Sequence, residues 1–225
     1  MIRLINIVWA VIIFNFSCFA YTDSTNVVKY SPEFKFTDGI YLSFDQVRNN
    51  SPVEKSRILT TTDYNSRDFF LELTNKKIFS FYDNMGEKID VEVKNIWGYA
   101  DNGVLFINVD NNFYRITIVG SICHFVAYVT TYTSGYPYDP YSNYYDYYSV
   151  RSNSRNEHTE LKQFIIDFKT GKIFNYNTEN LEVILMNDPE LHDEYASLRR
   201  KKKKQQKFMY IRKYNERNPL FFPEK

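Results

Sequence analysis

The sequence predicts an α+β protein: an antiparallel, β-rich meander that forms an open sheet or a barrel, followed by two C-terminal helices, the last one long and basic. From residue 39 onward, short alternating or apolar runs are separated by Gly, Asn and Asp, which is typical of strands joined by tight turns. After residue 177 the apolar residues recur with a helical period. The chain is long enough for one domain with a sizeable core, and we expect about seven to nine strands in it.

The net charge of +1 hides an asymmetry along the chain. Residues 1–198 carry 17 basic and 25 acidic side chains, whereas residues 199–225 carry 11 basic and 2 acidic ones. The C-terminal segment is therefore a separate electrostatic unit. Twenty Tyr and 19 Phe beside only seven Gly and seven Pro exclude a disordered or fibrous class.

The first twenty residues, MIRLINIVWAVIIFNFSCFA, predict export. Arg3 precedes an apolar stretch that ends in small residues, which is the pattern of a signal peptide, and the stretch is short for a membrane span. Cleavage after Ala20 is the favoured interpretation; acylation of Cys18 as a lipoprotein and an uncleaved anchor are the alternatives. Cleavage and acylation both leave Cys123 without a cysteine partner, so no internal disulfide is expected and the fold depends on its core.

These patterns divide the chain into four parts. Residues 1–20 are predicted as a signal peptide and residues 21–38 as an N-terminal linker. A β-rich globular domain with a tyrosine-rich loop at 131–160 spans residues 39–187, and a basic C-terminal helix and tail spans 188–225.

The first half of the predicted domain contains strands and one short helix. Ser43 and Gln46 have the spacing of a capping box, so residues 43–50 are predicted as a helix that ends before Pro52. Three further runs are predicted as strands: FFLEL, KKIFSFY and IDVEV, the last with Ile89, Val91 and Val93 facing inward.

Turn residues mark a meander in the middle of the chain. The segments 101–103 and 110–112 join three consecutive strands, because Asn and Gly readily adopt the positive φ that a tight hairpin requires. A further hairpin turns at residues 170–171.

Two helices are predicted to follow. Thr178 is a candidate N-cap for the first, and Asp188 for the second, with Pro189 at the first helical position, where a missing N–H costs nothing. The second helix is predicted to run from Pro189 to about Tyr214.

The segment SGYPYDPYSNYYDYYSV, residues 134–150, is the most unusual stretch of the chain. Pro and polar residues favour a poorly ordered insertion here. Tyr with Ser, Gly and Asn is also the composition of binding loops, so a binding role is the alternative, and a calcium site of Asp139, Asn143 and Asp146 is the least favoured one. The candidate ligand-binding residues, with a glycan as a possible ligand, are Tyr136, Tyr138, Tyr141, Tyr144, Tyr145, Tyr147 and Tyr148.

The run RRKKKKQQKFMYIRK contains nine basic residues and no acid. Behind an export signal it favours attachment to an anionic membrane surface or to an acidic protein partner over nucleic acid. A helix face that is merely solvated, or that folds back on the acidic body, is the alternative. The candidate anion-binding residues are Arg199, Arg200, Lys201, Lys202, Lys203, Lys204 and Lys207.

Other chemistry-bearing residues give weaker patterns. Cys123 and His124 are neighbours on a predicted strand and point to opposite faces, so they do not form a nucleophile–base pair, and a core cysteine beside a rim histidine is favoured. His192 lies near Asp188 and Asp193, but without the spacing of a zinc site. Serine-elbow, phosphate-loop and dinucleotide motifs are absent from the sequence, so no catalytic residue, metal or cofactor is predicted. Trp97 is predicted to be a core residue and not a sugar-stacking platform.

Four segments together carry a resemblance to a known group: GIYLSFDQVRNNSP, IWGYADNGVLFI, FYRITIVGSI and TGKIFNYNTENLEVILMNDPELHDEY, followed by the lysine-rich run and KYNERNPLF. They resemble exported proteins of Bacteroidota-type bacteria that have no assigned activity. The resemblance spans residues 36–222 apart from the tyrosine-rich stretch. It implies an envelope or secreted location.

The sequence therefore predicts an exported protein of the periplasm, outer envelope or medium that acts by binding or scaffolding. A carboxylate-dependent hydrolase of an envelope or extracellular glycan is one alternative, since many acids are present and their pairing is open. A membrane-associated subunit of an envelope complex, attached through the basic helix, is the other. The oligomeric state stays open.

Overall fold

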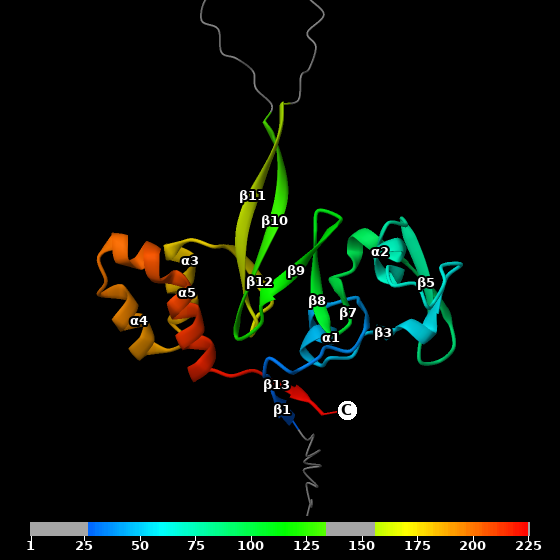
Figure 1. The fold of residues 1–225 in the computed structure, drawn as a ribbon, viewed down its shortest axis with the longest axis horizontal. Helices are drawn as coiled ribbons and strands as arrows, with labels where there is room; N and C mark the ends of the chain where they lie inside the picture. The colour runs from blue at the N-terminus through cyan, green and yellow to red at the C-terminus, as the bar shows by residue number, and fades with distance from the viewer. Residues whose placement is uncertain (1–26, 134–155, 225) are drawn as a thin grey trace, which may run out of the picture.

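An open, antiparallel eight-stranded sheet forms the centre of the computed structural model, which describes residues 27–133 and 156–224 (Figure 1). The α+β class is confirmed, and the open-sheet alternative holds. In spatial order its strands are β12 (Lys172–Asn175), β11 (Asn156–Asp167), β10 (Ile122–Thr133), β9 (Asn112–Ile118), β8 (Val104–Val109), β7 (Gly98–Asp101), β2 (Gly39–Tyr41) and β3 (Val53–Glu54).

Tight turns connect the middle strands as the sequence predicts. Asn102 and Gly103 join β7 to β8 with φ of 52° and 76°, and Asp110 and Asn111 join β8 to β9 with φ of 52° and 63°. Gly171, with φ of 73°, lies in the turn between β11 and β12. The predicted meander is thus confirmed by backbone conformations that suit its turn residues.

Two smaller sheets accompany the large one. The strands β4 (Ile58–Leu59), β5 (Ile78–Tyr82) and β6 (Lys88–Glu92) form a three-stranded sheet, and β1 (Val27–Lys29) pairs with β13 (Phe221–Pro223). The β1–β13 pair joins the two ends of the described chain. Phe222 of this pair is fully buried in the core cluster beside β10 and α1 (Phe44–Arg48). Phe36 is buried in the same cluster, so residues before position 39 contribute to the core.

The segment FFLEL is helical, and its predicted strand is wrong. It forms α2 (Phe69–Thr74), which buries Phe69, Phe70 and Leu73 at helical spacing and exposes Leu71. A run of five apolar residues does not distinguish a strand from a buried helix by period alone. The inward face predicted for IDVEV fails for Ile89, which is 37% exposed, but holds for Val93, which is buried in the core although it lies in a short 3₁₀ turn after β6.

Three helices cover one face of the sheet at its β10–β12 end: α3 (Thr178–Leu185), α4 (Pro189–Ala196) and α5 (Arg200–Arg217). Asp188 caps α4 ahead of Pro189, as predicted. The cap of α3 is Asn177, one residue before the predicted Thr178. The second predicted helix is divided into α4 and α5, because the chain is extended at Arg199.

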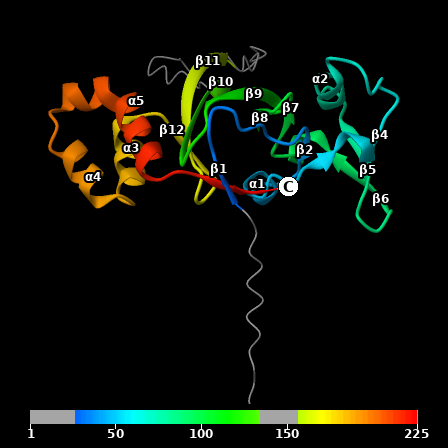
Figure 2. The same cartoon turned by 60° about the horizontal axis from the view of Figure 1, so that its bottom comes forward.

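Figure 2 shows these helices and the β4–β6 sheet at opposite ends of the large sheet. Between them, β10 and β11 extend from the body as a two-stranded arm, on which Tyr128 and Leu161 face each other and are more than half exposed (Figure 1). The seven candidate tyrosines of the loop lie outside the described residues. Within the described ranges, no helix combines the length and the apolar character needed to cross a membrane.

Candidate functional site

The basic run is divided by the structure into two sets of side chains. On the face of α5 that packs against the body, Lys203 binds Glu182 with a 2.9 Å Nζ–Oε2 distance, and Lys213 lies 2.6 Å from Glu194. Lys207 donates to the Tyr176 carbonyl and lies 3.6 Å from the centre of the Tyr176 ring. Burial lowers the pKa of Lys207. Lys203, Lys207 and Lys213 therefore support packing against the body, and the binding role predicted for Lys203 and Lys207 stays a prediction.

The other five predicted anion-binding residues lie at the start of α5 and are exposed: Arg199, Arg200, Lys201, Lys202 and Lys204. Among the described residues none of them forms a salt bridge. The pKa of Glu179 is lowered mainly by a hydrogen bond from Thr178, and the charges of Arg200 and Lys204 lower it further. We call these five residues the basic cluster.

The basic cluster opposes the electrostatics of the helix that carries it. The N-terminus of a helix bears a partial positive charge, where cations are unfavourable, and α5 has neither an acidic residue in its first turn nor a capping side chain. Arg200 and Lys204 also form a like-charge i,i+4 pair. The arrangement therefore costs helix stability, as is common at functional sites.

The C-terminal half of α5 is fixed to the sheet by specific contacts. The Asn215 side chain donates to the Ile122 carbonyl and accepts from the Ile122 N–H at 2.9 and 2.7 Å. Gly120 permits this approach, since a Cβ there would lie 2.2 Å from Asn215 Nδ2. Arg217 binds both oxygens of Asp188, and this contact lowers the pKa of Asp188. The C-terminal half of α5 is thereby held against the body.

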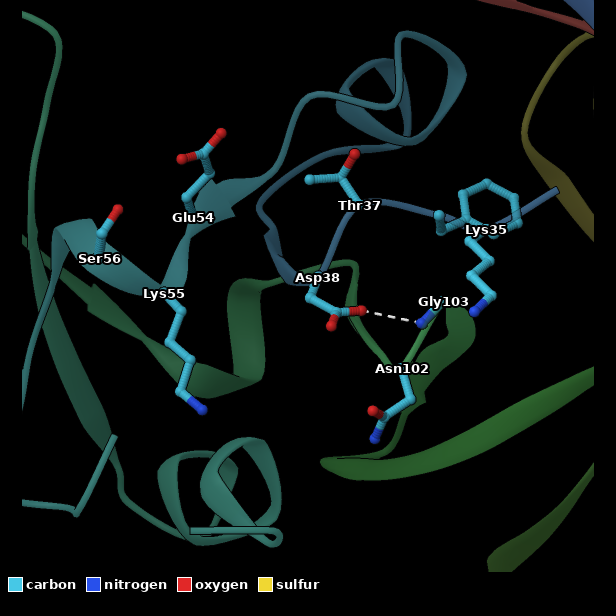
Figure 3. Close-up of a pocket in the computed structure, with 9 residues that line it drawn as sticks. Lys35, Thr37, Asp38, Glu54, Lys55, Ser56, Asn102 and Gly103 are labelled. Carbon is cyan, nitrogen blue, oxygen red and sulfur yellow. Dashed lines mark hydrogen bonds between the residues drawn. The ribbon is translucent and has the colours of Figure 1, made fainter. Parts of the chain in front are cut away.

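A charged cleft of about 540 Å³ lies at the other end of the sheet (Figure 3). It is lined by the segment before β2, the β3 region and the β7–β8 turn. Lys55 extends into it, while Glu54 and Ser56 point the opposite way, and Asp38 accepts a hydrogen bond from the Gly103 N–H at 2.9 Å.

Acidic side chains interact around this cleft. Burial, and then the negative charge of Asp38, raise the pKa of Asp101, whereas Lys55 opposes the shift. The Lys55 ammonium lies 4.3 Å from the centre of the Phe69 ring. Two carboxyl groups that interact in this way are an arrangement used for acid–base chemistry. The sequence did not single out these acids, since they come from separate segments.

Cys123 and His124 lie on opposite faces of β10, as predicted. Cys123 is fully buried in the core, which raises the pKa of its thiol to about 12 and excludes a reactive thiolate. His124 is buried too, and not at the rim as expected: its ring lies between Thr117 and Gln163 and against the rings of Tyr176 and Phe208. Burial lowers the pKa of His124, so the neutral form is favoured.

The remaining candidates have structural roles. His192 contacts Asp193 at 3.1 Å, and Asp188 is occupied by Arg217. No group of three metal-binding side chains occurs among the described residues. Trp97 is partly buried against the core, 5.8 Å from the Phe44 ring, which agrees with the predicted core role.

Together these features define a β-rich α+β protein with a fixed helix that presents a basic cluster. The chain belongs to DUF6563, a family of unknown function whose profile matches residues 39–218. No curated protein and no solved structure matches it significantly. The expected membership of a group without an assigned activity is thus confirmed, while export and a bacterial source remain predictions.

Proposed function

We propose that this protein is an exported binding protein of the cell envelope that attaches to an anionic membrane surface through the basic cluster of α5. One observation carries this proposal: five exposed cations lie together at the start of a helix, unpaired within the described ranges, at a cost to that helix. Their neighbours Lys203 and Lys213 are paired with acids of the body, so the acidic body does not account for the cluster.

The binding energy expected per basic residue favours attachment by several cations acting together. Each basic residue near an anionic membrane contributes about 1 kcal/mol, so five contribute enough for reversible association. The helix is fixed by Asn215 and Arg217, so little ordering entropy is lost on binding. An exported protein would meet the anionic lipid head groups of an envelope membrane, and these would supply the negative surface that the basic cluster binds.

The test is a comparison of two variants with the same charge change. In the first, Gln replaces each of the five cluster residues; in the second, Gln replaces five exposed basic residues elsewhere: Lys35, Arg67, Lys77, Lys94 and Lys172. Envelope fractions of the producing cells are washed with increasing salt. We expect only the cluster variant to leave the membrane fraction at low salt, and the native protein to leave it by about 1 M salt, where the screening length is ~3 Å. Equal retention of both variants would refute attachment through α5.

Hydrolysis of a glycan is a second candidate, favoured by the raised pKa of Asp101 beside Asp38. Purified protein would be assayed for release of reducing ends from envelope polysaccharide. We expect Asp101→Asn and Asp38→Asn each to abolish release, with Asp63→Asn, an exposed acid of the β4–α2 loop, as the control. Release that survives both substitutions would exclude this cleft as the catalytic site.

A further inference from the structure

A second cavity, of about 580 Å³, lies beside the C-terminal half of α5. Its walls come from three places: the β9–β10 connection, the side of α5 that carries Phe208 and Ile211, and the two chain ends that meet at the β1–β13 pair. Its volume is in the range of about 300–1,000 Å³ that is typical of small-molecule sites. The cavity is distinct from the basic cluster and from the cleft in Figure 3.

The walls of this cavity are mainly apolar. The apolar lining residues are Tyr30, Pro32, Ile118, Val119, Phe208, Ile211, Pro219 and Leu220. Phe208 is 46% exposed although its ring packs on His124 and Tyr176. Protein interiors are normally close-packed, so an apolar hollow of this size between a helix and a sheet leaves many contacts unmade.

Charged side chains line the same cavity. Lys29 and Arg212 contribute two cations and Glu216 one acid, and none of the three forms a salt bridge within the described part of the chain. The polar Asn215 is already occupied by the Ile122 backbone. The lining therefore combines an apolar wall with a net positive charge, which is complementary to an amphiphile with an anionic head.

The cavity also has a defined cover. Tyr30 donates its N–H to the Leu220 carbonyl at 2.8 Å, which holds the N-terminal and C-terminal segments together across one side. Gly120 and Asn215 fix the distance between the helix and the sheet on the opposite side. Because both sides are held by specific contacts, the hollow is a built feature of the fold.

We propose that this cavity binds a single acyl chain that carries an anionic head group, with the chain against Ile118, Val119 and Leu220 and the head near Arg212 and Lys29. A free fatty acid and a lysophospholipid share this chemistry. Binding of either is independent of the basic cluster, and it would place a lipid-derived ligand next to the helix that is proposed to contact the membrane.

The experiment measures binding of dansylaminoundecanoate to the full-length protein by fluorescence, with dodecanoate, dodecyl phosphate and dodecanol as competitors. Ile118→Trp fills the cavity and is expected to weaken probe binding at least tenfold, with Leu71→Trp, an exposed site on α2, as its control. Arg212→Glu is expected to weaken competition by dodecanoate at least threefold and to leave dodecanol unchanged, with Arg67→Glu as the charge control.

The two anionic competitors distinguish a lysophospholipid from a fatty acid as the ligand. Stronger competition by dodecyl phosphate would indicate a phospholipid head group, and stronger competition by dodecanoate would indicate a fatty acid. Absence of saturable probe binding, or Ile118→Trp binding as tightly as the native protein, would overturn the proposal. If Ile118→Trp does not fold, as judged by circular dichroism, the decision rests on Arg212→Glu. An unchanged preference for anion over alcohol in that variant would then be the contrary result.

Discussion

The two halves of α5 both carry basic residues but differ in how they contact the rest of the protein. Its C-terminal half is fixed to the body by Asn215 and Arg217, each with specific partners. Its N-terminal half carries the basic cluster, which has no ion pair within the described residues and opposes the helix dipole. A run of basic residues is therefore not one site. The face of the helix on which a cation lies decides whether it supports the fold, as Lys203 and Lys207 do, or remains for a partner.

The largest expected effect comes from breaking the fixed half. In Gly120→Ala, the new Cβ would collide with Asn215, so the side chain moves and both hydrogen bonds to Ile122 are lost. We expect a loss of about 2–4 kcal/mol in the free energy of unfolding, measured by urea denaturation. Asn215→Ala should cost a similar amount, and the double variant little more than either single one. Fully additive losses would show that the two residues do not act together.

The next effect concerns the ion pair of Asp188. Arg217 lowers the pKa of this carboxylate, so the stabilisation is present above the unfolded-state pKa, near 3.9, and is lost as the pH falls through the lower folded-state value. Asp188→Asn keeps the N-cap but loses the pair, at a cost of about 1 kcal/mol at pH 7. Melting curves from pH 7 to pH 2 should show a weaker acid dependence in the variant than in the native protein. Parallel curves would contradict the role of this pair.

His124 gives a smaller effect in a different pH range. Burial lowers its pKa in the folded protein, so the unfolded chain takes up a proton first and stability falls as the pH drops below about 6.5. His124→Gln should remove this loss between pH 7 and pH 5 while retaining a polar side chain near Gln163 and Thr117. The contrary result is an unchanged slope of melting temperature against pH in that interval.

The smallest effect on stability is expected in the basic cluster itself. Replacing its five residues by Gln should leave the free energy of unfolding unchanged or raise it by up to about 1 kcal/mol, because like charges are removed from a helix N-terminus. Replacing Lys203 alone should lower it, since Glu182 loses its partner. A destabilised cluster variant, in the same urea titration, would mean that these cations support the fold after all.

Local signals predicted much of the fold but not its long-range contacts. The turns at Asn102 and Asp110 and the cap at Asp188 depend on residues within a few positions of each other, and all three were predicted. The helix α2 was not predicted, because a short apolar run fits the period of a strand as well as that of a helix. The Asn215–Ile122 contact was not predicted either, because it joins residues 93 positions apart. The candidate site was predicted in part: the run marked the basic residues, but only packing shows which face the body.

Cosedimentation with anionic vesicles shows whether the basic cluster serves binding and not folding. Full-length native protein, the five-residue Gln variant and the matched control variant are mixed with phosphatidylglycerol-containing vesicles over a range of salt concentrations. We expect the native and control proteins to sediment at low salt and to be released as the salt concentration rises, whereas the cluster variant stays in solution with a melting temperature that is not lowered. Equal sedimentation of the three proteins would contradict attachment to the lipid surface through the basic cluster. Native protein that binds envelopes but not the vesicles would also contradict it and would indicate an acidic protein partner.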